Sequence, residues 1–160
     1  MDGQKTRKPQ FWFVSSRPEF ERFVSEWQER TLPKRDWTHA AHVAIAAYHV
    51  IDYRGTALER VRNGIIRYNE ATGVANTATS GYHETLTRFW LGIVAKLLEE
   101  FGDSFEGAQH AVAELGDKRD LFKAYYSFDV VAHFGARKIW IAPDRTGPYE
   151  RSEIDSVRVC

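Results

Sequence analysis

The sequence has 160 residues, a length typical of one domain with one hydrophobic core. Its 22 basic and 22 acidic residues balance, so nothing favours nucleic acid or an anionic membrane as a partner, and a small molecule is the expected ligand. The single cysteine excludes an internal disulfide, which predicts a reducing, cytoplasmic compartment rather than secretion.

The first half of the chain predicts three helices. In the first, residues 18–30, apolar side chains recur at helical spacing against a charged face. The second, residues 39–53, is rich in alanine, the best helix former, and Asp36 or Thr38 can cap its start. The third, residues 56–73, again repeats apolar residues on one face and ends at a glycine.

The second half begins with a polar stretch without periodicity, residues 74–81, which predicts a loop. Residues 82–101 carry a wide apolar face and are expected to form the central helix. Two shorter helices are expected at residues 104–115 and 118–127. Residues 130–142 could extend the last helix or form a lone strand.

These elements predict an all-α fold, a compact single-domain bundle of about five to six helices over residues 1–160. Residues 1–14 are expected to be a flexible lead-in and residues 145–160 a mobile tail. The longest apolar-rich stretch, residues 89–98, is about half the roughly 20 residues of a membrane span, so we expect a buried helix there. A homodimer remains an open possibility, because an unburied apolar helix face would favour one.

Two histidines stand at the start of the alanine-rich helix, in the segment Trp37-Thr38-His39-Ala40-Ala41-His42. Residues three apart on a helix share a face, with Cβ atoms about 5–6 Å apart, so both rings can approach one ion or one ligand. His39 and His42 are therefore candidate metal ligands.

A third histidine lies in the segment Gly81-Tyr82-His83-Glu84-Thr85-Leu86-Thr87, at another expected helix start. The N-terminal end of a helix disfavours a positive charge, so we expect His83 to be neutral and able to ligate a metal or act as a base. Glu84 could orient an imidazole, act as a general base or complement the helix dipole.

Three imidazoles predict a site for a divalent metal, zinc or iron, with His39, His42 and His83 as ligands. His83 and Glu84 are the candidate catalytic residues. The simpler alternative is that these histidines are hydrogen-bonded packing residues. The remaining histidines, His49, His110 and His133, are expected to have packing or surface roles.

Four further side chains are candidate substrate-binding residues. Trp37 and Tyr82 could form aromatic walls of a pocket, and Asn69 could bind a polar group. Arg137 could hold a carboxylate or phosphate with its planar guanidinium. Core packing, turn formation and a surface salt bridge are the simpler explanations for these residues.

The combination of four segments, at residues 37–42, 66–69, 81–87 and 136–144, resembles a family of small, uncharacterised bacterial helical proteins. The family shares the W-T-H-x-x-H and G-Y-H-E-T-L-T segments. The resemblance implies a bacterial helical domain and no particular reaction, and it suggests that the four segments belong to one site.

The leading hypothesis from the sequence is a metal-dependent enzyme that acts on a small polar molecule by hydrolysis, hydration or elimination through a metal-bound water. The first alternative is a metal-free enzyme that uses the histidines for acid–base catalysis. The second alternative is a non-catalytic module that binds a small ligand or a partner.

Overall fold

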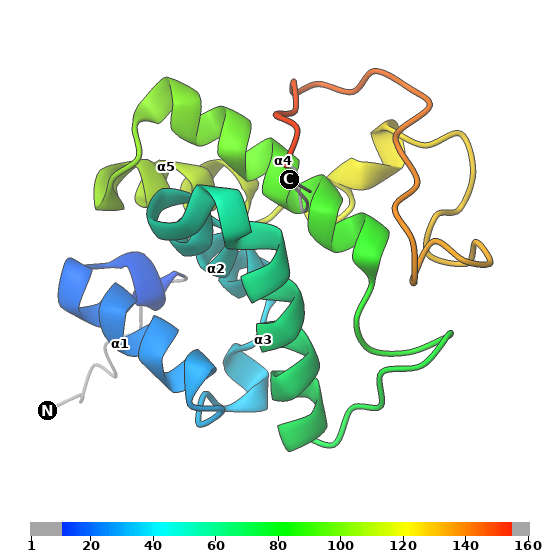
Figure 1. Cartoon of the computed structure of the whole chain (residues 1–160). Coiled ribbons are helices and arrows are strands. Elements are labelled where there is room, and N and C mark those ends of the chain that lie inside the picture. The colour runs from blue at the N-terminus through cyan, green and yellow to red at the C-terminus, as the bar shows by residue number, and fades with distance from the viewer. Residues whose placement is uncertain (1–10, 155–160) are drawn as a thin grey trace, which may run out of the picture.

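The computed structural model describes residues 11–154, and in this part of the chain all regular elements are helices. The predicted all-α class is therefore confirmed (Figure 1). Five α-helices form the body of the fold: α1 (Arg17–Gln28), α2 (His39–Tyr53), α3 (Ala57–Ala71), α4 (Glu84–Phe101) and α5 (Phe105–Leu115). The described residues also form four short 3-10 helices: η1 (Trp12–Val14) before α1, η2 (Lys34–Asp36) and η3 (Arg54–Thr56) on either side of α2, and η4 (Leu121–Ala124) after α5.

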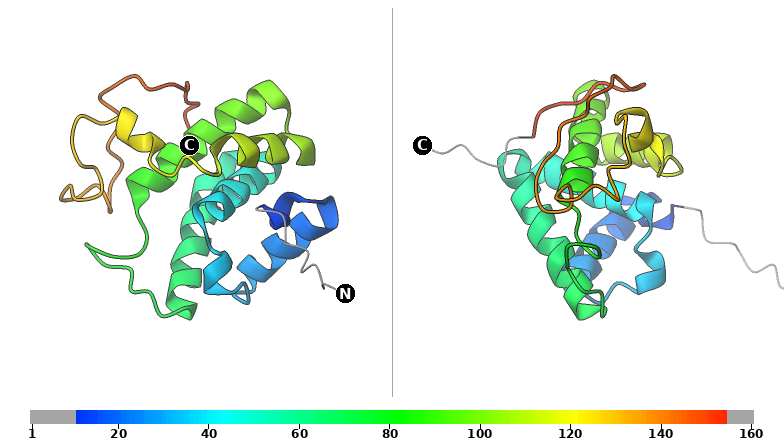
Figure 2. Two further views of the ribbon diagram at one scale, coloured as in Figure 1. Left: turned by 180° about the vertical axis from the view of Figure 1, so that it is seen from behind. Right: turned by 90° about the vertical axis from the view of Figure 1, so that its right-hand side faces the viewer.

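Helices α2 and α4 share the centre of the bundle. Each packs against the other and against α3 and α5, while α1 packs beside α3 (Figures 1 and 2). The α2 helix is buried on most sides because its alanines leave room for close neighbours; the buried alanines are Ala40, Ala41, Ala44, Ala46 and Ala47.

Four of the five α-helices begin at a side chain that accepts a hydrogen bond from the first turn. Ser16, Thr38 and Ser104 cap α1, α2 and α5 with their hydroxyl groups, and His83 caps α4 with its ring. Each cap satisfies a backbone N–H that the helix itself leaves unpaired. Thr38, rather than Asp36, is thus the cap of α2.

The helix predicted at residues 118–127 is wrong in extent, because only the four residues of η4 form a 3-10 helix. The residues after η4 are held by contacts with distant parts of the chain instead of by helical hydrogen bonds. Tyr125 and Tyr126 lie against Phe89, and the Tyr126 hydroxyl donates to the Ile141 carbonyl at 2.8 Å.

Residues 130–142 form turns rather than a helix or strand. The Thr85 hydroxyl donates to the Ile139 carbonyl at 2.7 Å and accepts from the Ile141 N–H at 3.1 Å. The Ile139 carbonyl and the Ile141 N–H therefore bond to a side chain of α4 and are not available to a helix or a strand.

The described parts of the predicted lead-in and tail are packed, which corrects both expectations there. Phe13 and Val14 are buried, and the Val14 carbonyl accepts a hydrogen bond from Gln109. The C-terminal segment runs back along α4 (Figure 2), where the Ser152 N–H donates to the Gly92 carbonyl and Ile154 is buried. The rest of both regions, residues 1–10 and 155–160, lies outside the described residues.

Among residues 11–154, none of the helices combines the length and the apolar character that crossing a membrane requires.

Candidate functional site

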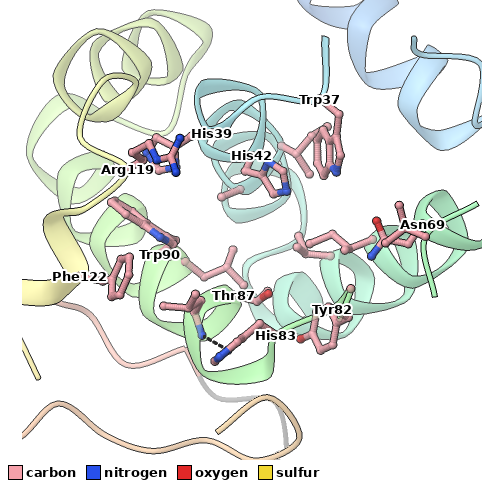
Figure 3. A pocket seen from close by; sticks show the side chains of 18 residues that line it. Trp37, His39, His42, Asn69, Tyr82, His83, Thr87, Trp90, Arg119 and Phe122 are labelled. Atoms are coloured by element: carbon pink, nitrogen blue, oxygen red, sulfur yellow. Dashed lines mark hydrogen bonds between the residues drawn. The ribbon is translucent and has the colours of Figure 1, made fainter. Parts of the chain in front are cut away.

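A cavity of about 500 Å³ opens between α2, α3 and α4 (Figure 3). Apolar and aromatic side chains dominate its lining, and three histidines and one arginine supply most of its polarity. The lining residues are Trp37, His39, His42, Ile45, Ala46, Val61, Ile65, Asn69, Val74, Gly81, Tyr82, His83, Leu86, Thr87, Trp90, Leu91, Arg119 and Phe122.

Most of the residues predicted for the site line this one cavity. His39, His42 and Trp37 lie on the α2 side, and Figure 3 places His83 across the cavity at the start of α4. Asn69 and Tyr82 reach it from α3 and from the loop before α4. Glu84 and Arg137 do not line it.

His42 is held in one orientation by two neighbours. Its ring stacks on the indole of Trp37, with centroids 3.7 Å apart, and its Nδ1 lies 2.7 Å from the Thr38 carbonyl oxygen. The ring faces the cavity but is otherwise surrounded by protein, and this burial lowers the pKa of His42 to about 4. The imidazole is therefore neutral at pH 7.

Two neighbours, Leu115 and Trp90, also hold the ring of His39 in one orientation. Its Nε2 lies 3.0 Å from the Leu115 carbonyl oxygen, and its ring meets the Trp90 indole edge-on, with centroids 4.6 Å apart. Burial is the main cause that lowers the pKa of His39, and the Arg119 guanidinium adds to it. A second neutral imidazole thus faces the cavity.

His83 acts as the N-cap of α4. Its Nδ1 accepts a hydrogen bond from the Leu86 N–H at 3.2 Å, drawn in Figure 3. Burial, followed by the charge of Arg137, lowers the pKa of His83, so the ring is neutral as predicted, although burial rather than the helix dipole is the main cause. Its Nε2 is buried without a hydrogen bond in the described part of the chain, and the Val130 carbonyl nearby favours a proton there.

Glu84 binds Arg62 and Tyr82 instead of facing the cavity. Its carboxylate accepts from Arg62 Nε at 2.7 Å and from Arg62 Nη2 at 2.9 Å, and the Tyr82 hydroxyl donates to it at 3.0 Å. The Glu84 carboxylate is nearly buried, and the pairing with Arg62 compensates the charge that burial would otherwise leave unsolvated. In this arrangement Glu84 positions the Tyr82 ring beside the cavity and makes no hydrogen bond to an imidazole of the described chain.

Arg137 supports the backbone rather than a ligand. Its guanidinium donates to the Gly81 carbonyl at 2.8 Å, while the carbonyl of Arg137 accepts from the Glu84 N–H at 2.9 Å. These two bonds fix the loop that enters α4. The guanidinium predicted to clamp a substrate group is thus engaged with the main chain.

Asn76 connects α3 to the same loop. Its side-chain oxygen accepts from Asn69 Nδ2 at 2.9 Å and from the Tyr82 N–H at 3.0 Å, and its own amide donates to the Ile66 carbonyl. Asn76 thus bridges residues 66–69 and 81–87, and the bonds of Arg137 join residues 136–144 directly to 81–87. The fourth resembling segment, residues 37–42, lines the same cavity.

The nitrogen atoms of the three histidines are not equally available to a metal. The backbone carbonyls beside His39 and His42 each take one ring nitrogen, and the other has no hydrogen bond within residues 11–154, as in many metal-binding histidines. His83 uses its Nδ1 lone pair for Leu86, and its Nε2 is buried. Within the described residues no group of three or more His, Cys, Asp or Glu side chains is arranged to hold a metal ion.

Several residues of the site were missed by the sequence reasoning. Arg62 pairs with Glu84 from 22 positions away, and Arg119 and Phe122 reach the cavity from the segment after α5. Such distant partners leave no local pattern in the sequence. Trp90 also lines the cavity, although an aromatic residue at helical spacing by itself favours core packing.

Comparisons of the chain with known protein families, with curated proteins and with solved structures gave no match.

Proposed function

We propose that this protein binds a small, mainly apolar molecule that carries hydrogen-bond donors in the cavity between α2, α3 and α4. The observation that carries the proposal is that neutral His39 and His42 line one aromatic cavity, each with one ring nitrogen that has no partner in the described part of the chain. The volume of about 500 Å³ lies in the range of roughly 300–1,000 Å³ typical of small-molecule sites.

The hydrogen bonds of the two histidines determine which nitrogen carries the proton. A backbone carbonyl can only accept, so the proton of His42 sits on Nδ1, beside Thr38, and that of His39 on Nε2, beside Leu115. In a neutral ring the other nitrogen then has a lone pair. His42 Nε2 and His39 Nδ1 are therefore acceptors that suit a ligand with O–H or N–H groups.

The charges around the cavity further restrict the ligand. Arg119 is the one ionised side chain in the lining, beside His39 (Figure 3), and no carboxylate lines the cavity within the described chain. A cationic ligand would lose its hydration without gaining a counter-ion. The lining therefore favours a neutral ligand, or one with an anionic group near Arg119.

Phenol and anisole provide a direct test, because both are small and aromatic but only phenol has a donor. We expect phenol to bind saturably, and anisole about tenfold more weakly because it leaves the acceptor nitrogen unpaired. In His39→Ala/His42→Ala this preference should disappear, because both acceptor nitrogens are removed, whereas His110→Ala, an exposed histidine outside the cavity, should keep it. Isothermal titration calorimetry at neutral pH measures both affinities. Absent saturable binding, or an unchanged preference in His39→Ala/His42→Ala, contradicts the proposal.

A metal-free acid–base enzyme is the second candidate. It is favoured by the same free nitrogens, since a neutral imidazole in a pocket can accept a proton from a bound substrate. His42, with a pKa of about 4, is a weak base, so His39 is the better candidate for this role. Turnover that is lost in His39→Gln but retained in His42→Gln would support this function over simple binding.

A further inference from the structure

A second cavity, of about 440 Å³, lies between the end of α1 and the outer face of α3 and shares no residue with the first. Figure 1 shows α1 ending beside α3. The lining of this second cavity is mostly polar: Trp27, Gln28, Arg30, His49, Thr56, Glu59, Arg60, Asn63, Gly64 and Arg67. His49 thus belongs to a different cavity from His42, although both are on α2.

Positive charge is in excess around this cavity. Arg30, Arg60 and Arg67 line it against a single acidic side chain, Glu59. None of the three arginines forms an ion pair within residues 11–154, and Glu59 offsets only one of their charges. His49 adds no charge, since burial, and then Arg60, lowers its pKa.

Arg30 has an unfavourable backbone conformation. It is the only non-glycine residue of the described chain with a positive φ, 63°, and it follows the end of α1. The Thr31 N–H donates to the Glu26 carbonyl across it at 2.8 Å, a helix ending in which glycine is the favoured residue. An arginine here strains the backbone and places a guanidinium at the cavity, which points to a use for its side chain.

Arg60 is held in place before any ligand binds. Its guanidinium carbon lies 3.9 Å from the centroid of the Tyr53 ring, and its Nε donates to the Thr56 hydroxyl at 3.0 Å. Its two terminal amino groups make no hydrogen bond to the described protein. A guanidinium fixed in this way loses less side-chain freedom when it binds an anion.

The inner wall of the cavity is apolar. A Cβ atom on Gly64 would come within 2.1 Å of the Trp27 ring, so the indole lies directly against the α3 backbone. The indole N–H of Trp27 is buried and has no hydrogen-bond partner in the described part of the chain. Trp27 is 2% exposed, so this wall closes the cavity behind the arginines.

We propose that this second cavity binds the phosphate group of a small phosphorylated molecule. Three arginines against one glutamate leave two positive charges, and a phosphate monoester carries about −1.5 to −2 at pH 7. Guanidinium groups bind phosphate oxygens through paired hydrogen bonds. The cavity of about 440 Å³ is larger than a phosphate group and leaves room for an organic portion of the ligand.

Calorimetric titration of the full chain with inorganic phosphate at low ionic strength tests the proposal. We expect one saturable site, weakened about tenfold or more in Arg60→Gln and in Arg67→Gln. Arg35→Gln is the matched control, because Arg35 is also exposed and without an ion pair in the described chain but lies outside both cavities. The Arg35→Gln variant should bind phosphate with the affinity of the wild type.

Arg30→Gly adds a second test, which distinguishes an arginine that binds phosphate from one that only stabilises the fold. Glycine relieves the strained backbone, so the midpoint of thermal unfolding should rise while phosphate binding weakens. An equal loss of phosphate binding in Arg35→Gln would show general charge attraction and overturn the proposal. Acetate binding as tight as phosphate binding, or no saturable site, would overturn it as well.

Discussion

The imidazole of His42 lies almost flat on the indole of Trp37, with ring centroids 3.7 Å apart and an angle of 28° between the planes. Because Thr38 binds its Nδ1 at 2.7 Å, the ring cannot turn without losing this stacking and this hydrogen bond. One nitrogen, Nε2, is left as an acceptor. Stacking on Trp37 and the bond to Thr38 thus fix the orientation and the protonated nitrogen of an imidazole that lines the cavity.

We expect the free energy of unfolding to decrease as the pH is lowered from 6.5 towards 4. The pKa of His42 is about 4 in the folded protein and 6.5 ordinarily, so the unfolded chain takes up the proton first. The stability contributed by the neutral ring is present above pH 6.5 and is lost as the pH falls towards 4. His42 contributes at most about 3 kcal/mol to this loss.

Chemical denaturation at a series of pH values measures this effect in the wild type and in His42→Gln. The variant should lose less stability over the same interval, because it lacks the titrating ring. Equal losses in the two proteins would show that His42 is not responsible.

Replacing His83 separates its capping role from its other contacts. His83→Asn keeps an acceptor at the N-cap of α4, whereas His83→Ala leaves the Leu86 N–H unpaired. We expect the asparagine variant to be more stable than the alanine variant by about 1 kcal/mol. Urea denaturation of both variants provides the measurement, and equal stabilities would rule out a capping contribution.

Removing Arg62 should destabilise the fold more than removing a surface arginine. In Arg62→Met the nearly buried Glu84 carboxylate loses both of its guanidinium hydrogen bonds, and we expect a loss of about 2 kcal/mol. In Arg62→Met/Glu84→Gln part of this loss should be recovered, because no unpaired charge remains.

Arg54→Met is the matched control for this comparison. Arg54 pairs with Glu99 and Asp103 at the surface, where each side chain is more than 40% exposed. Exposed pairs contribute about 0–1 kcal/mol, so this variant should stay near the wild type in denaturant unfolding. If Arg54→Met lost as much free energy of unfolding as Arg62→Met, the distinction between the exposed and the nearly buried ion pair would be wrong.

Metal removal distinguishes the binding proposal from the metal enzyme predicted from the sequence. Since His83 uses its Nδ1 for Leu86, we expect chelation to change neither the thermal midpoint nor phenol binding. Metal analysis of untagged protein and thermal unfolding with added zinc complete the test. A zinc-induced rise in the midpoint that is lost in His83→Asn would instead support the three-histidine site.

Local patterns in the sequence were sufficient to predict the helical class and most helix boundaries. The predicted second helix coincides with α2, and the glycine, serine and threonine positions near the other helices mark their ends within a few residues. These features depend on neighbours within one or two turns, such as Thr38 accepting from the Ala41 N–H. The same locality explains why the stretch after α5, whose contacts are distant, was predicted poorly.

The sequence by itself determined which residues could carry chemistry: two histidines on one face of α2 and a third at the start of α4. Only the tertiary structure decided what each can do, because the availability of a nitrogen or a carboxylate depends on partners far along the chain. Leu115 takes one nitrogen of His39, and Arg62 takes the carboxylate of Glu84. Burial, which also comes from distant segments, decides that the imidazoles are neutral.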